Sequence, residues 1–187
     1  WDYTSGMIYS REAFGFGKYE IRCKIPKGRS FWSVMMLFGE ENHEVDVFEF
    51  WNEHDAFGRL SEEKLSSVCR ISTHANKARC SSSFDGINFS EDFHTFTFFW
   101  NNNKLEFFID GALVRTSYKF YTPLGQPVDC SNIKKGNVYL LDKTYPMNDL
   151  HISVGLSIQA GRNAPDSSTP FPSALEIDYI RYWRYVN

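Results

Sequence analysis

Apolar and polar residues alternate with a period of two in several segments of this chain, and no segment repeats convincingly with the period of a helix. Residues 18–25 and 175–183 alternate cleanly, as strands do when one face of a sheet meets water. Residues 93–100 and 104–111 alternate on either side of an Asn-rich turn and predict a hairpin. Further strands are predicted at residues 31–38, 65–74 and 151–159. Many short strands with frequent turns indicate a β-sandwich of antiparallel sheets.

Three segments without clear periodicity lie between the predicted strands. Residues 52–63 are polar and are expected to form a surface loop, and residues 75–86 are interpreted as a loop as well. Residues 118–147 contain several prolines and glycines and predict a long loop, with one strand near residues 138–141. Loops of that length are usually functional or mobile.

One predicted strand carries three acids. Residues 44–49 read Glu-Val-Asp-Val-Phe-Glu, so Glu44 and Asp46 share one face, while strict alternation turns Glu49 to the other. A β-bulge around Val47 and Phe48 would add one residue to the strand and return Glu49 to the acidic face. We therefore predict three carboxylates in a row on one surface of a sheet.

Such a row suits the cleavage of a glycosidic bond, which needs one carboxylate to attack and one carboxylic acid to donate a proton. The alternative is an edge strand that presents its acids to water. Apolar residues 31–38 and the pair Phe50-Trp51 enclose the acidic segment, and burying unpaired charge is costly. This context favours the catalytic interpretation.

Length and composition exclude several classes of protein. The 187 residues are interpreted as a single domain, residues 1–187, which is long enough to bury roughly 70% of the surface of its unfolded chain. The net charge of −3 gives no electrostatic reason to expect nucleic acid or an acidic membrane as a partner. No apolar run approaches the roughly 18 residues that a membrane span needs. Aromatic residues make up 17% of the chain, enough to fill a core and leave some for stacking on sugar rings.

The cysteines leave the redox state open. They are Cys23, Cys69, Cys80 and Cys130, and no C-x-x-C pair indicates zinc. Cys69 and Cys80 flank a short strand-like segment and could form a disulfide in an oxidising compartment. Buried free thiols are the equal alternative.

The order of motifs resembles glycoside hydrolase family 16, whose members include laminarinases, lichenases, agarases and carrageenases. Residues 44–49 match the bulged E-x-D-x-x-E form of the family's signature. The other segments that carry the resemblance are residues 4–8, 16–22, 25–28, 92–96, 108–111 and 177–182. Several motifs in the right order are far more specific than one.

The resemblance implies an all-β jelly-roll sandwich of two curved antiparallel sheets, a sugar cleft across the concave one, and further strands before Trp1. It also implies a retaining mechanism with Glu44 as nucleophile, Glu49 as general acid/base, and Asp46 between them to orient the nucleophile or supply charge. The two carboxyl groups of a retaining pair lie about 5–5.5 Å apart. Burial and a neighbouring negative charge both favour a protonated Glu49.

The sequence also departs from the family pattern. Members often have Trp-Pro-Ala-x-Trp before the acidic strand, whereas this chain keeps only Trp32, and His43 replaces a common Gly before the first acid. These changes leave the acids intact and put a standard laminarinase specificity in doubt.

Five other side chains are candidates for binding. Trp32 and Trp51 bracket the acidic strand and are either platforms for sugar rings or core residues. His74 could hydrogen-bond a sugar hydroxyl or the acid/base carboxylate, and Gln159 is a plausible sugar hydrogen-bonder. Asp178 resembles a position that in many members helps to hold a structural calcium, although one carboxylate cannot make a site of six to eight oxygens. No cofactor is expected to be required.

We therefore expect a retaining, endo-acting glycosidase that is secreted, periplasmic or on the cell surface, and monomeric. The favoured substrate is a β-1,3- or mixed-linkage glucan, followed by a red-algal galactan such as agar, porphyran or carrageenan. A non-catalytic carbohydrate-binding sandwich and a transglycosylase with the same covalent intermediate are the alternatives.

Overall fold

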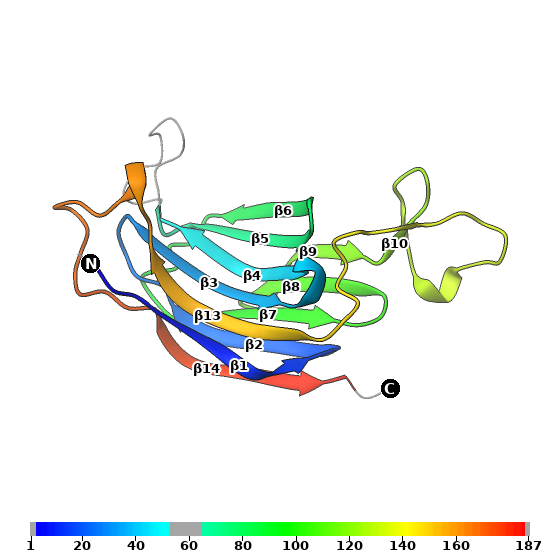
Figure 1. Cartoon of the computed structure of the whole chain (residues 1–187), viewed down its shortest axis with the longest axis horizontal. Coiled ribbons are helices and arrows are strands. Elements are labelled where there is room, and N and C mark those ends of the chain that lie inside the picture. Colours follow the sequence, from blue (N-terminus) through cyan, green and yellow to red (C-terminus); the bar gives the residue numbers. More distant parts are fainter. Residues whose placement is uncertain (1–2, 53–64, 186–187) are drawn as a thin grey trace.

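The computed structural model describes residues 3–52 and 65–185 and shows two antiparallel sheets packed as a sandwich (Figure 1). The expected β-sandwich is confirmed. The first sheet has the strand order β1-β13-β3-β4-β5-β6. Its strands are β1 (Gly6–Phe14), β13 (Leu150–Ile158), β3 (Phe31–Phe38), β4 (Glu44–Trp51), β5 (Val68–Ala75) and β6 (Ala78–Asp85).

The second sheet lies against the inner face of the first and has the order β14-β2-β7-β8-β9. Its strands are β14 (Glu176–Arg184), β2 (Gly17–Lys24), β7 (His94–Trp100), β8 (Lys104–Ile109) and β9 (Ala112–Tyr118). The β7–β8 hairpin is the one that the Asn-rich turn predicts. Helical structure in the described residues is confined to single 3-10 turns, namely η1 (Glu40–Asn42), η3 (Cys130–Asn132) and η4 (Gly161–Asn163).

The predicted loops are only partly loops. Residues 75–86 contain β6, because the sequence there pairs residue for residue with β5 even though its side chains are mostly small, polar and exposed. The long segment after β9 holds a small sheet that projects from one end of the sandwich (Figure 1). Its strands are β11 (Pro127–Val128), β10 (Phe120–Tyr121) and β12 (Leu140–Leu141). The predicted loop at residues 52–63 lies outside the described residues except for Asn52.

The core between the sheets is largely aromatic, and it fixes the position of β4. Phe48 and Phe50 are fully buried, and the ring of Phe48 lies 4.5 Å from that of Phe96 on β7. Phe50 packs 4.9 Å from Phe89. Burying a side chain of this size contributes roughly 1.5–3 kcal/mol. The inner face of β4 is therefore held firmly, so the side chains on its outer face start from a rigid backbone.

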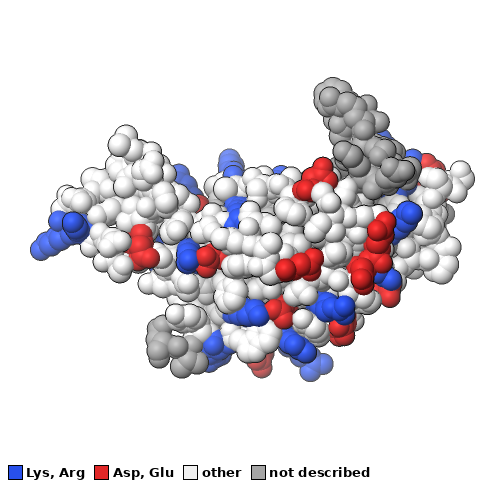
Figure 2. Space-filling model, turned by 180° about the vertical axis from the view of Figure 1, so that it is seen from behind, with Lys and Arg blue, Asp and Glu red and all other residues white. Residues whose placement is uncertain are grey.

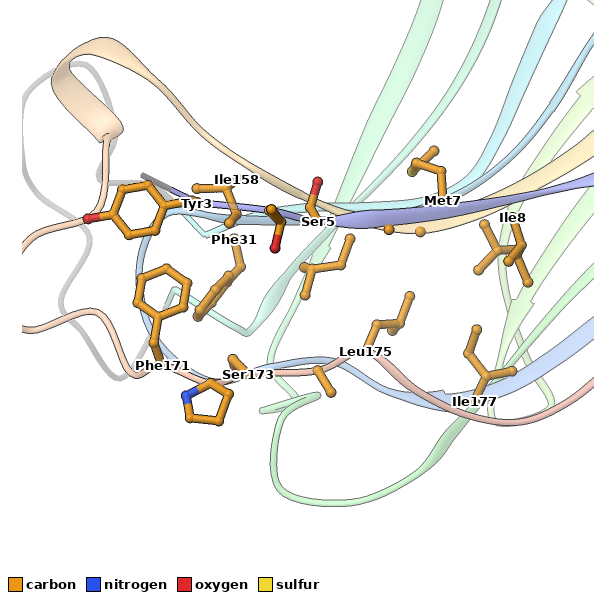
Figure 3. A pocket seen from close by; sticks show the side chains of 17 residues that line it. Tyr3, Ser5, Met7, Ile8, Phe31, Ile158, Phe171, Ser173, Leu175 and Ile177 are labelled. Carbon is orange, nitrogen blue, oxygen red and sulfur yellow. The ribbon is translucent and has the colours of Figure 1, made fainter. Parts of the chain in front are cut away.

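The two sheets part at the edge formed by β1 and β14, which are the terminal strands of their sheets. An apolar groove of about 940 Å³ opens there, and Figure 3 shows side chains from both strands and from the segment before β14 pointing into it. Ile8 of β1 is 55% exposed and Ile177 of β14 is 37% exposed. The groove lies between the sheets, so it is separate from the outer face that carries the acids.

All four cysteines are free thiols, and a Cys69–Cys80 disulfide is wrong. The β5–β6 ladder places Cys69 opposite Phe84 and Cys80 opposite Thr73. Four residues of extended strand span roughly 13 Å, whereas a disulfide needs Cα atoms within about 7 Å. Burial raises the pKa of the Cys23 thiol to about 12, so this thiol stays protonated in the core.

Surface charge is mixed. Figure 2 shows basic and acidic side chains interspersed over one face, without a large area of either sign. In the described part of the chain, no helix has the length and apolar character needed to cross a membrane.

Candidate active site

A β-bulge in β4 brings the three acids onto one face, as predicted. In the ladder with β3, Met35 pairs with Phe48 and Met36 pairs with Asp46, so Val47 is the extra residue. The ladder with β5 shifts register between Asp46 and Glu49. Val47 and Phe48 are both part of the core. The next residue, Glu49, therefore returns to the outer face.

Two tryptophans hold the Glu49 carboxyl group, which is 5% exposed. The indole Nε1 of Trp51 donates to Glu49 Oε1 at 3.0 Å, and that of Trp32 donates to the same oxygen at 3.3 Å. The hydroxyl of Ser72 on β5 lies 3.4 Å from the other oxygen, Oε2. Because Oε1 already accepts two N–H groups, Oε2 is the oxygen left to carry a proton.

Trp32 and Trp51 are therefore not core residues. Trp32 is 36% exposed and Trp51 is half-buried, and their rings meet edge to face with centroids 5.5 Å apart. The guanidinium of Arg70 lies 5.3 Å from the Trp51 ring. Both indoles position Glu49, and their role as platforms for sugar rings stays a prediction.

Asp46 is almost completely buried between the other acids, and its pKa is raised to about 9. Burial is the main cause, followed by the negative charges of Glu49 and Glu44 and a hydrogen bond to the Glu44 carboxylate, while a hydrogen bond with Ser72 opposes the shift. Asp46 Oδ1 is buried without a hydrogen-bond partner in the described residues. A proton on this carboxyl group removes a charge from the cluster and gives the group a hydrogen to donate.

His74 contacts Asp46 and lies beside Glu44. Its Nε2 is 3.0 Å from Asp46 Oδ2 and 4.0 Å from Glu44 Oε1. With a neutral Asp46, one hydrogen lies between Oδ2 and His74 Nε2, and the tautomer of His74 sets which of the two groups donates it. These two contacts join His74 to the nucleophile side of the cluster, whereas the sequence suggested a sugar hydroxyl or Glu49 as its partner. Glu44 itself is the most open of the three acids, with 39% of its side chain exposed.

Glu44, Asp46 and His74 could also hold a metal ion. In the described chain they are the only group of three or more Asp, Glu, His or Cys side chains with ligand atoms close enough together. The ligand atoms of Glu44, Asp46 and His74 all lie within 4.8 Å of one another. The predicted calcium position, Asp178, belongs to no such group. Its carboxylate accepts a hydrogen bond from Arg22 at 2.7 Å. Calcium binding at Asp178 stays a prediction.

Gln159 lies just beyond the end of β13, at the edge of the site. Its Nε2 is 3.4 Å from the carbonyl oxygen of Phe31, and its backbone N–H donates to Ser30. In the ladder of β13 with β3, Ser157 is opposite Trp32. Gln159 is therefore near the Trp32 end of the sheet, and its contact with a sugar stays a prediction.

Three aromatic side chains that the sequence interpretation overlooked lie at the Glu44 end. Phe38 pairs with Glu44 across the β3–β4 ladder, and its ring lies 5.9 Å from Tyr9 and 5.9 Å from His151. Tyr9 is 59% exposed. Alternation within residues 31–38 would have placed Phe38 on the acidic face, but Tyr9 and His151 join it only through the pairing of β1, β13 and β3.

Replacing His74 tests its contact with Asp46. We expect His74→Ala to lower kcat/KM on the polysaccharide that the protein cleaves by about 10- to 100-fold, because Asp46 Oδ2 loses its hydrogen-bond partner. His74→Gln, which keeps an N–H donor, should retain more activity than His74→Ala. His94→Gln is the control, since His94 pairs with Asp110 on the second sheet. Equal activity of His74→Ala and wild type would contradict this role.

The fold and the site together define a class of β-sandwich proteins that carry a row of carboxylates on the outer face of one sheet. Within this class, the chain belongs to glycosyl hydrolases family 16, which residues 2–180 match. The resemblance found in the sequence is confirmed.

Known members show moderate to low identity. The chain is 20% identical over 203 residues to a glucan endo-1,3-beta-glucosidase of Cryptopygus antarcticus, covering 98% of this chain and 68% of that protein. It is 21% identical over 207 residues to a beta-glucanase of Rhodothermus marinus, covering 99% and 64%. The chain therefore spans about two thirds of the length of these relatives.

The fold agrees with that of solved members. The laminarinase catalytic domain of Thermotoga maritima superposes with a TM-score of 0.68 at 22% identity, covering 97% of this chain and 69% of that one. This similarity supports the jelly-roll arrangement of the two sheets.

Proposed function

We propose that this chain is a retaining, endo-acting glycoside hydrolase that cleaves a β-linked polysaccharide. The observation that carries the proposal is the Val47 bulge, which places Glu44, Asp46 and Glu49 on one face and leaves Glu49 buried under two indoles. Three acids held in this way are not needed for binding a glycan. They suit a reaction that uses a nucleophile and a proton donor.

In the first step, a Glu44 oxygen attacks the anomeric carbon while Glu49 donates its proton from Oε2 to the departing glycosidic oxygen. The glycosidic C–O bond breaks and an ester forms between the sugar and Glu44. In the second step, Glu49 removes a proton from a water molecule, the water attacks the anomeric carbon, and Glu44 is released as a carboxylate. A neutral Asp46 adds no negative charge beside Glu44, so repulsion within the cluster does not oppose the release of Glu44 as a carboxylate.

We propose a β-1,3- or mixed-linkage glucan as the substrate, because two relatives that align with nearly all of this chain are a glucan endo-1,3-beta-glucosidase and a beta-glucanase. A red-algal galactan is the second choice. Polysaccharides of this size do not enter cells, so a secreted, periplasmic or cell-surface location is part of the proposal, as is a monomeric state.

Incubation of the folded protein with laminarin, lichenan, agarose, porphyran and carrageenan tests the proposal. We expect new reducing ends from at least one of them and products of several sugar units, as an endo-acting enzyme gives. Adding an acceptor oligosaccharide separates hydrolysis from transglycosylation, because a transglycosylase passes the sugar from Glu44 to the acceptor in preference to water. Binding of a polysaccharide without any turnover would instead identify a carbohydrate-binding protein.

A further inference from the structure

Arg70 is a cation on the acidic face that the proposed reaction does not use. Cys69 and Ile71, its neighbours on β5, are buried in the core, so alternation places Arg70 on the outer face with Ser72 and His74. The β4–β5 ladder pairs Arg70 directly with Glu49. Arg70 is therefore the cross-strand neighbour of the proposed proton donor.

The position of the Arg70 guanidinium leaves hydrogen-bonding capacity unused. It lies over the ring of Trp51, with Cζ 5.3 Å from the centroid. Its Nη1 is buried and has no hydrogen-bond partner in the described chain. Among the described residues, no acid forms an ion pair with Arg70, and Glu49 takes its N–H donors from the two indoles instead. A buried N–H group of a cation without a partner is unusual in a folded protein.

A second arginine lies on the same side of the acidic strand. Arg79 of β6 pairs with His74 across the β5–β6 ladder, so it shares the outer face with His74 and is exposed. No acid in the described chain forms an ion pair with it. Ser81 and Ser83 follow on the same face of β6 and are exposed as well. The β5–β6 side of the site thus presents two cations and a row of hydroxyl groups.

We propose that Arg70, supported by Arg79, forms an anion-recognising subsite beside Glu49, so that a glucan or galactan that carries a sulfate or carboxylate group on the sugar bound there is preferred to its unsubstituted counterpart. The guanidinium has planar, paired donors that match such oxyanions. Without these cations, the negative charge of the catalytic cluster would repel an acidic chain. This inference rests on the proposed function and names the substrate class of the same site.

Matched pairs of neutral and acidic polysaccharides test the subsite. Agarose and porphyran form a galactan pair that differs in sulfate, while laminarin is compared with its sulfated and its carboxymethylated derivatives to separate sulfate from carboxylate. For wild type, we expect a higher kcat/KM on the acidic member of at least one pair. Arg70→Gln should reduce the ratio of acidic to neutral kcat/KM by about 10- to 100-fold. Arg70→Lys keeps the charge without the planar donors, so its ratio of acidic to neutral kcat/KM should lie between those of wild type and Arg70→Gln.

The control is Arg22→Gln, which removes a cation from the second sheet, where Arg22 pairs with Asp178. It should leave the ratio unchanged. A wild-type enzyme that prefers the neutral member of every pair would overturn the proposal. So would an Arg70→Gln variant that loses activity equally on both members with a shifted pH profile, because Arg70 would then act on Glu49 and not on the substrate.

A binding measurement separates this inference from the proposed function. In a Glu44→Gln background, oligosaccharides from the same pairs are titrated by calorimetry with and without Arg70→Gln. Tighter binding of the acidic oligosaccharide that depends on Arg70 supports the subsite even if no polysaccharide is cleaved. Equal affinity for both members overturns it, whatever the activity.

Discussion

Glu49→Gln and Glu44→Gln are each expected to lower the rate of polysaccharide cleavage by about 1,000-fold or more. Glu49→Gln removes the proton that the leaving oxygen needs, and general acid catalysis alone contributes about 100- to 10,000-fold. Glu44→Gln removes the group that forms the covalent bond to the sugar. Reducing-end release on the substrate found in the panel measures both losses.

An activated substrate distinguishes the two roles. A fluoride or dinitrophenyl leaving group departs without protonation, so Glu49→Gln should still form the glycosyl ester from such a substrate, whereas Glu44→Gln should not. Glu176→Gln is the control, because Glu176 is exposed and pairs with Lys24 on the second sheet. If both site variants retain wild-type hydrolysis while folded, the assignment of Glu44 and Glu49 is wrong.

Asp46→Asn is expected to change how stability depends on pH. The pKa of Asp46 is about 9 in the folded protein, against about 3.9 in an unfolded chain. Between these values the folded state holds a proton that the unfolded state releases. The contribution of Asp46 to the free energy of unfolding is therefore complete below about pH 4. It falls as pH rises toward 9, with a slope of at most about 1.4 kcal/mol per pH unit.

Asn resembles the protonated acid and does not titrate, so the stability of Asp46→Asn relative to wild type should rise steadily from pH 5 to pH 8. Denaturant unfolding at intervals of one pH unit measures the difference. Asp85→Asn, at an exposed position on β6, is the control for loss of a surface carboxylate. Parallel pH profiles for Asp46→Asn and wild type would show that Asp46 is ionised in the folded protein.

Much of the site could be predicted because it depends on local pattern. Acidic and apolar residues alternate at the start of residues 44–49, and a β-bulge at Val47 follows if all three acids are to lie on one face. Trp32 and Trp51 were placed near the acids because they bracket the same strand. Their actual contact could not be predicted, since both indoles converge on one oxygen of Glu49 only when β3 and β4 are in register.

The parts that escaped prediction depend on pairing between distant strands. Ser72 and Arg70 reach the site because β5 lies beside β4, and nothing in their own segment marks them as functional. The β6 strand looked like a loop because its residues are small and polar, yet hydrogen bonding to β5 makes it a strand. Local propensity was overruled there by the neighbouring backbone.

The extra residue in β4 implies that this strand tolerates changes of side chain better than changes of length. Another small aliphatic residue at position 47 would leave the number of residues in β4 unchanged. An insertion or deletion anywhere between Glu44 and Glu49 would instead turn every later side chain of the strand to the opposite face of the sheet. An acid would then enter the aromatic interior and a phenylalanine would face the sugar.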